Sequence, residues 1–181
     1  MVISTKFTHS DLLAIPYDGK RREIVDGEIL VTPSPQVNHQ RILLNLAWAF
    51  RKYLMEHPIG ELVVSPMDVI LSELDVLEPD LLFVLEEHKY ILKDWVRGTP
   101  DLVIEILSPT TEANDCGPKL KAYARFGVTE YWIVNPTARA IDVYRLSPEG
   151  YQLAQTCHQH DTLASPLLPG FTLSVGPIFQ F

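Results

Sequence analysis

The first part of the chain changes from a strand-like to a helix-like spacing of its hydrophobic residues. Residues 22–32 alternate between apolar and polar positions around Asp26-Gly27, a pair typical of a two-residue hairpin turn. After Pro33-Ser34-Pro35, residues 36–56 carry apolar side chains at helical spacing, namely Ile42, Leu43, Leu46, Ala49, Phe50, Tyr53 and Leu54. The sequence therefore predicts a strand pair followed by the longest helix of the chain.

The rest of the chain carries mostly strand patterns. We predict strands over residues 61–71, 80–85, 101–107, 130–134, 140–146 and 151–157. One shorter helix, capped by Asn114 or Asp115 and with Pro118 in its first turn, should end at Gly127. Residues 86–99 show no regular pattern. The expected fold is α+β, with a mixed sheet, a long early helix and a shorter helix between strands.

Length and composition limit the class of protein. The chain has 181 residues, 46% of them hydrophobic, which suits one domain spanning residues 1–181. No apolar run approaches the ~18 residues of a membrane span, so we expect a cytoplasmic protein without a membrane partner. Cys116 and Cys157 form no short-spaced pair, which argues for reduced thiols and against a zinc site.

The charge balance restricts how nucleic acid could bind. The formal net charge is -8, whereas nucleic-acid binders usually carry a clustered basic surface. If DNA is the partner, the positive charge must therefore be local.

Two apolar runs carry carboxylates at their ends. If the strands over residues 80–85 and 101–107 are antiparallel neighbours, the start of the first lies beside the end of the second, which brings Asp80 close to Glu105. Asp101 lies four residues from Glu105 on the same strand, about 13 Å away at ~3.3 Å per residue, and cannot share a metal with it. A buried carboxylate is costly unless it is paired or binds a cation, so a metal ion is the expected partner of Asp80 and Glu105.

The donor set indicates which metal and which chemistry. A small number of oxygen ligands suits Mg²⁺, which keeps several waters and takes one or two carboxylates together with phosphate oxygens. Such an ion can polarise a phosphodiester, while a nearby ammonium offsets charge on the phosphate. Lys119 could supply the ammonium. Lys121 is the nearby alternative, but the two point roughly 200° apart on a helix of 3.6 residues per turn.

Several short motifs together resemble a known family. They are residues 23–28 (EIVDGE), Pro33-Ser34-Pro35 with His39, residues 66–69 (PMDV), Pro79-Asp80-Leu81, residues 101–109 (DLVIEILSP), Lys119 with Tyr123, residues 127–132 (GVTEYW) and residues 166–170 (PLLPG). On these motifs the chain resembles, nearly from end to end, the bacterial Uma-two family of proposed endonucleases, within the PD-(D/E)xK restriction-endonuclease-like superfamily.

The resemblance implies a fold and a site. It implies a restriction-endonuclease-like core in which Asp80, Glu105 and the main-chain carbonyl of Ile106 hold Mg²⁺, with Mn²⁺ as a substitute, for hydrolysis of DNA phosphodiester bonds. The usual lysine two residues after the strand acid is replaced by Leu107. In relatives that lysine can come from the following helix, and Lys119 matches that position.

Three further residues fall on the family pattern. His39 could lie near the metal or the phosphate, or could be a helix-start histidine with a satisfied hydrogen bond. Glu23 and Asp68 are candidates for an outer layer around the site, although carboxylates at strand ends often serve only turns or salt bridges.

The sequence is compatible with two functions and with a homodimeric assembly. The first function is a Mg²⁺-dependent endonuclease acting on DNA; the second is a catalytically silent binding or regulatory module with a nuclease fold. The apolar residues of the tail, residues 171–181, should dock somewhere. A partner chain in a homodimer is one option for that docking.

Overall fold

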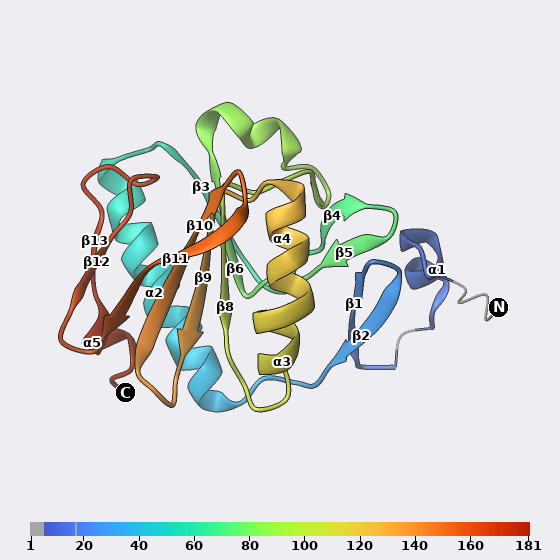
Figure 1. The fold of residues 1–181 in the computed structure, drawn as a ribbon, viewed down its shortest axis with the longest axis horizontal. Helices are drawn as coiled ribbons and strands as arrows, with labels where there is room; N and C mark the ends of the chain where they lie inside the picture. Colours follow the sequence, from blue (N-terminus) through green and yellow to red (C-terminus); the bar gives the residue numbers. More distant parts are fainter. Residues whose placement is uncertain (1–5, 17) are drawn as a thin grey trace.

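A six-stranded mixed sheet forms the centre of the molecule (Figure 1). The computed structural model describes residues 6–16 and 18–181. Only the β8–β9 pair of this sheet is parallel. In spatial order its strands are β11 (Gly150–His158), β10 (Ala140–Ser147), β9 (Glu130–Asn135), β8 (Leu102–Ile106), β6 (Leu81–Leu85) and β3 (Gly60–Val64). This confirms the predicted mixed sheet.

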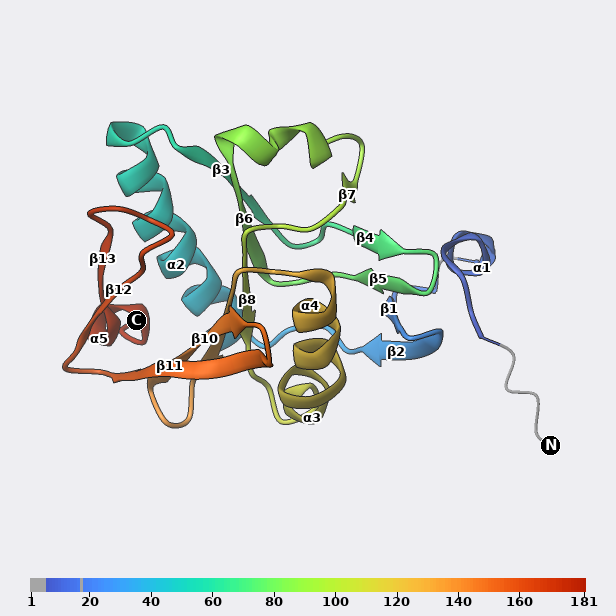
Figure 2. The ribbon, with the colours of Figure 1, turned by 45° about the horizontal axis from the view of Figure 1, so that its top comes forward.

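Two helices cover opposite faces of the sheet, as Figure 2 shows. Helix α2 (Val37–Glu56) packs its buried apolar side on the face that presents Leu102, Ile104 and Ile106 of β8. Helix α4 (Leu120–Phe126) packs on the other face, where Val103 belongs to a second apolar cluster. Because side chains alternate along a strand, Glu105 shares the α4 face with Val103.

A smaller five-stranded sheet lies beside the main one. It contains the predicted hairpin, formed by β1 (Arg21–Val25) and β2 (Glu28–Thr32), whose turn has positive φ at Asp26 and Gly27. The other strands are β5 (Asp75–Leu77), β4 (Val69–Ser72) and β7 (Val96–Arg97). The short helix α1 (His9–Ala14) precedes the hairpin.

The prediction of one strand over residues 61–71 is wrong. The segment divides at Ser65-Pro66 into β3 of the main sheet and β4 of the smaller sheet. Proline has no N–H to give to a strand ladder, so pairing is interrupted there. Residues 86–99, expected to be irregular, contain the 3₁₀ helix η1 (Glu86–Ile91) and β7.

The helix before Gly127 starts earlier than predicted. It begins with α3 (Glu112–Asn114) and continues through a π-helical turn, η2 (Asp115–Lys119), into α4. Neither Asn114 nor Asp115 acts as a side-chain cap at its start, because both lie inside the helical segment. Gly127 ends the helix with φ 86°, as predicted. The wider turn contains the buried pair Asp115 and Lys119.

The C-terminal segment packs on its own chain. It forms a hairpin of β12 (Thr162–Ala164) and β13 (Thr172–Ser174), then α5 (Val175–Ile178), next to α2 (Figure 1). Its buried members are Phe171, Leu173, Val175, Ile178 and Phe179, which belong to the same apolar cluster as α2. The tail therefore needs no partner chain to cover it.

No helix in the described part of the chain combines the length and the apolar character needed to cross a membrane.

Candidate active site

A cavity of about 270 Å³ opens where β1, the first turn of α2, the start of β6 and the end of β8 meet the helical segment α3–η2. Most of the residues predicted from sequence line it. The charged and histidine side chains of its wall are Arg21, Glu23, His39, Glu78, Asp80, Glu105, Asp115 and Lys119. Six of these eight residues are buried, the exceptions being Arg21 and His39, so the charges among them interact strongly.

The pairing of β6 with β8 brings Asp80 and Glu105 to the same edge. The two strands are antiparallel, with Leu81 opposite Ile104 and Phe83 opposite Leu102. Asp80 directly precedes β6, and Glu105 is the penultimate residue of β8. Asp101 lies at the other end of β8, where it accepts a hydrogen bond from the Leu85 N–H and contacts His88. The predicted strand pairing is thus confirmed, with Asp101 apart from the other two acids.

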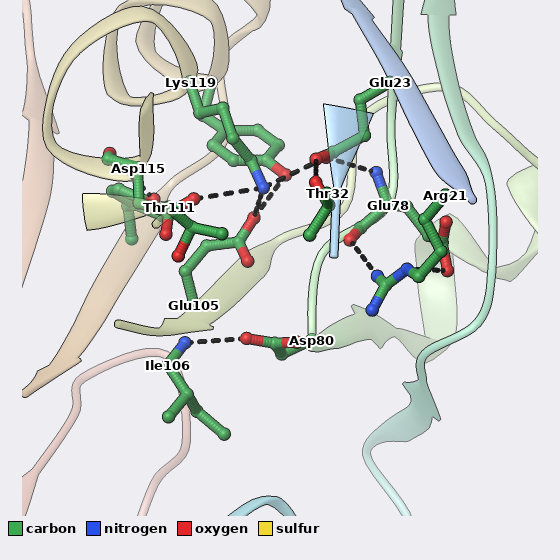
Figure 3. Close-up of polar contacts among 12 residues, drawn as sticks. Arg21, Glu23, Thr32, Glu78, Asp80, Glu105, Ile106, Thr111, Asp115 and Lys119 are labelled. Carbon is green, nitrogen blue, oxygen red and sulfur yellow. Dashed lines mark hydrogen bonds and ion pairs between the residues drawn. The ribbon is translucent and has the colours of Figure 1, made fainter. Parts of the chain in front are cut away.

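Asp80 is held through one of its two oxygens. Its Oδ2 accepts the main-chain N–H of Ile106 at 2.8 Å and lies 3.1 Å from His39 Nε2 (Figure 3 shows the first contact). Among the described residues, Oδ1 has no hydrogen-bond or ion-pair partner. His39, at the start of α2, therefore touches a predicted metal ligand.

Glu105 is also held through one oxygen. Its Oε1 lies 2.5 Å from Lys119 Nζ and accepts a hydrogen bond from the Tyr123 hydroxyl at 3.1 Å. Its Oε2 has no hydrogen-bond or ion-pair partner within the described ranges. Burial raises the pKa of Glu105 well above its ordinary value; Lys119 opposes this, and the carboxylates of Asp115, Asp80 and Glu23 add to it.

Lys119 is shared by three carboxylates (Figure 3). Besides Glu105, its Nζ lies 3.0 Å from Glu23 Oε1 and 3.2 Å from Asp115 Oδ1, and the residue is only 3% exposed. Burial by itself would lower the pKa of Lys119, but the three acids together raise it well above its usual value. The three acids thus favour the charged form of Lys119. Lys121, the alternative, is exposed.

Comparison with known proteins identifies the family of the chain. The Uma2 family, described as "Putative restriction endonuclease", matches residues 9–176. The chain belongs to the Uma2 family. An uncharacterised protein of Synechocystis sp. is 26% identical over 165 residues, covering 89% of this chain and 84% of that protein. Both matches extend over almost the whole length of the chain.

A solved structure shows what fold the Uma2 chain has. The crystal structure of a protein from Anabaena variabilis, described as "a putative nuclease belonging to DUF820", superposes with a TM-score of 0.79. The match covers 96% of this chain and 97% of the other at 18% sequence identity. The restriction-endonuclease-like fold predicted from the motifs is therefore confirmed.

The donor atoms of the cavity fit a hard divalent cation. Carboxyl groups outnumber cations in the cavity wall: five buried acids, Glu23, Glu78, Asp80, Glu105 and Asp115, lie beside two cations, Arg21 and Lys119. The open oxygens, Asp80 Oδ1 and Glu105 Oε2, belong to carboxylates, which Mg²⁺ prefers. Within residues 6–16 and 18–181 no group of three His, Cys, Asp or Glu side chains is arranged to hold a metal. The predicted set needs only two carboxylates, together with the Ile106 carbonyl.

Glu23 and Asp68, both predicted for an outer layer, have different positions. Glu23 touches Lys119 and also accepts hydrogen bonds from the Glu78 N–H at 2.8 Å and the Thr32 hydroxyl at 3.2 Å. Asp68 does not line this cavity; it lines a neighbouring one.

Sequence reasoning missed three residues of the site. Asp115 was considered only as a helix cap, although its spacing of four from Lys119 is a signal for a helical ion pair. Arg21 precedes Glu23 by two positions on β1, a spacing that places both on one face of the strand. Glu78, its ion-pair partner at 2.9 Å, carried no signal of its own.

Proposed function

We propose that this Uma2 chain is a Mg²⁺-dependent endonuclease that hydrolyses phosphodiester bonds of DNA. The supporting observation is that Asp80, Glu105 and Lys119, which come from three separate elements, line one cavity. Family membership and the nuclease description of the Anabaena variabilis protein point to the same class of reaction.

Each site residue has a distinct role in this proposal. Asp80 and Glu105 would hold Mg²⁺, or Mn²⁺ in its place, with the Ile106 carbonyl as a further ligand. A bound divalent cation polarises a phosphodiester and lowers the pKa of a bound water. His39 and the Ile106 N–H orient Asp80, and Tyr123 orients Glu105.

Lys119 would provide positive charge on the phosphate side of the cavity. Its three carboxylate partners keep the ammonium charged and fix its position, as a group aimed at developing negative charge requires. Glu23 and Asp115 thus act through Lys119.

Cleavage of supercoiled plasmid tests the proposal. The wild type is incubated with Mg²⁺ or Mn²⁺, with EDTA as a control, beside an identically purified Glu105→Ala variant. We expect metal-dependent nicking or linearisation that falls at least a hundredfold in the variant. Asp101→Asn, which changes an acid at the opposite end of β8, is the matched control and should keep cleaving. Equal cleavage by wild type and Glu105→Ala would refute the proposal.

One observation favours the second function, a catalytically silent binding module. Lys119 is almost fully buried and has three acidic partners, as expected for a charge cluster that only stabilises the fold. That reading predicts no cleavage under any metal. Calorimetric titration with Mg²⁺ then shows whether the carboxylates still bind a cation.

Homodimerisation stays a prediction. An apolar tail in need of cover no longer supports it, because every apolar tail residue of the core cluster is buried in its own chain and only Phe181 is exposed. Multi-angle light scattering of the purified protein measures the mass in solution and decides between monomer and dimer.

A further inference from the structure

Arg21 is the second Lys or Arg side chain in the cavity wall and has no role in the proposal above. It belongs to Lys20-Arg21-Arg22, the chain's one run of three consecutive basic residues. Arg22 forms a two-point ion pair with Asp18 at 2.6 and 2.7 Å, and Lys20 lies 3.9 Å from the same carboxylate. Arg21 does not contact Asp18 and faces the cavity.

The exposure of the two cations differs. The Lys119 side chain is 4% exposed and has three acidic partners, whereas that of Arg21 is 24% exposed and has one. An anion that enters the cavity from solvent can therefore reach the guanidinium more directly than the ammonium.

Glu78 does not use all the N–H donors of the Arg21 guanidinium (Figure 3). Arg21 Nε lies 2.9 Å from Glu78 Oε1, but these two buried atoms are not aligned for a hydrogen bond, and Arg21 Nη2 donates to the Glu78 carbonyl at 3.2 Å. Among the described residues, Nη1 has no acceptor. Since a guanidinium carries five N–H donors in a rigid fork, Glu78 can hold one edge while another edge remains available to an anion.

Arg21 also stands between two cavities. The neighbouring cavity, of about 640 Å³, shares Arg21, Pro35 and Glu78 with the first, and Lys20 and Arg22 are in its wall. The guanidinium therefore lies where the two cavities adjoin, within reach of a strand that occupies both.

We propose that Arg21 binds a backbone phosphate of the DNA strand, next to the phosphate that is cleaved, with Glu78 holding the guanidinium in place. This inference rests on the proposed nuclease function. Planar two-point recognition of phosphate is the geometry for which arginine is suited, and it positions the strand without taking part in the bond-breaking step.

Binding is measured without cleavage, by fluorescence anisotropy of a labelled DNA duplex in EDTA at several KCl concentrations. We expect Arg21→Gln to weaken binding about tenfold, since a hydrogen-bonded charge contact is lost. The slope of log K against log[KCl] should become shallower by about one, the effect of one phosphate contact. Arg97→Gln, which removes an exposed arginine outside both cavities, is the matched control and should leave the slope unchanged.

A double variant separates phosphate binding from a purely structural ion pair. Arg21→Gln leaves Glu78 buried without its partner, whereas Arg21→Gln/Glu78→Gln removes both charges. If Arg21 only neutralises Glu78, the double variant should bind DNA like the wild type. If Arg21 binds phosphate, the affinity of the double variant should remain about tenfold below that of the wild type. Glu78→Gln alone should bind more tightly, because a negative charge beside the guanidinium is removed while the Glu78 main-chain carbonyl still holds Nη2.

The outcomes distinguish this inference from the proposed function. In the plasmid assay, Arg21→Gln should raise KM with kcat kept within twofold, whereas Glu105→Ala should lose kcat. If the wild type cleaves DNA but Arg21→Gln has unchanged affinity and an unchanged salt slope, the role of Arg21 is refuted. The proposed nuclease function then still stands. A wild type that neither cleaves nor binds the duplex overturns both. Thermal melting identifies any variant that is unfolded. Arg21→Lys keeps the positive charge but loses the forked N–H donors of the guanidinium, so it should bind DNA with intermediate affinity.

Discussion

Lys119 and Lys121 lie two positions apart on one helical segment and have opposite environments. The Lys119 side chain lines the cavity and contacts three acids, whereas Lys121 is exposed. The helical repeat explains the difference, because two residues rotate the side chain by roughly 200°. At the residue scale, burial and charge together therefore decide which of two identical side chains can serve the site.

This pair gives a matched test of the catalytic lysine. Lys119→Gln should reduce plasmid cleavage at least a hundredfold and lower the free energy of unfolding by about 3–5 kcal/mol, since it leaves buried acids without their cation. Lys121→Gln should change cleavage less than twofold and stability by less than about 0.5 kcal/mol. Cleavage rates and urea denaturation provide the two measurements. A Lys119→Gln enzyme as active as Lys121→Gln would remove Lys119 from the mechanism.

Metal binding can be tested without activity. Mg²⁺ should raise the melting temperature of the wild type, with a stabilisation of about 2.7 kcal/mol when its concentration is 100 times Kd. Asp80→Asn should lose most of this rise because one of two carboxylate ligands is gone, while Asp101→Asn should keep it. Differential scanning fluorimetry with and without Mg²⁺ measures each shift against the variant's own metal-free value. An equal rise in melting temperature in all three proteins would show that Mg²⁺ binds at another site.

At the scale of elements, the site depends on where strands pair. Glu105 and Asp80 come together only because β6 and β8 are antiparallel, and β6 is held on its other side by β3. Gly60 begins β3, where an added Cβ would overlap the Val84 carbonyl and would lie 2.5 Å from the Phe83 ring. The close approach of the β3 and β6 backbones thus requires glycine at this position.

Substitution of Gly60 tests this requirement. Gly60→Ala should cost about 1–3 kcal/mol of unfolding free energy, the usual range for an overpacked site, because backbone cannot move aside as a flexible side chain can. Gly117→Ala is the control, since nothing lies within 4 Å of its Cβ position and it sits in the helical turn η2. Chemical denaturation compares both with the wild type. Equal stabilities would show that β3 shifts to accommodate the methyl group.

At the scale of the whole molecule, the C-terminal segment completes the core. Phe171 contacts the rings of Phe50 and Tyr53 on α2, and Asn45 of α2 donates hydrogen bonds to carbonyls of the tail. Phe181, by contrast, is 61% exposed. The first and last thirds of the chain therefore share one apolar cluster.

The two phenylalanines test how much the tail contributes. Phe171→Ala should lower the free energy of unfolding by about 3–5 kcal/mol, because a large side chain is removed from a packed core. Phe181→Ala should cost less than about 0.5 kcal/mol. Denaturation at two protein concentrations gives both values. A small cost for Phe171→Ala, or a midpoint that rises with concentration, would support cover by a second chain.

The sequence by itself predicted most of the local elements and singled out the carboxylates of Asp80 and Glu105. The alternation of apolar residues predicted the hairpin at Asp26-Gly27, and their helical spacing over residues 36–56 predicted the helix observed as α2. A carboxylate inside an apolar strand marked Glu105. Such patterns are visible because periodicity and the cost of burying charge act over a few neighbouring residues.

Only the tertiary structure decided which distant groups meet. Glu23 reaches Lys119 across 96 positions of chain and Arg21 reaches Glu78 across 57, through the pairing of β1 and the packing of η2. The division of residues 61–71 between two sheets and the burial of the tail against α2 are likewise long-range events. Local spacing tells which face of an element a side chain occupies, but the partner of that face depends on how the whole chain packs.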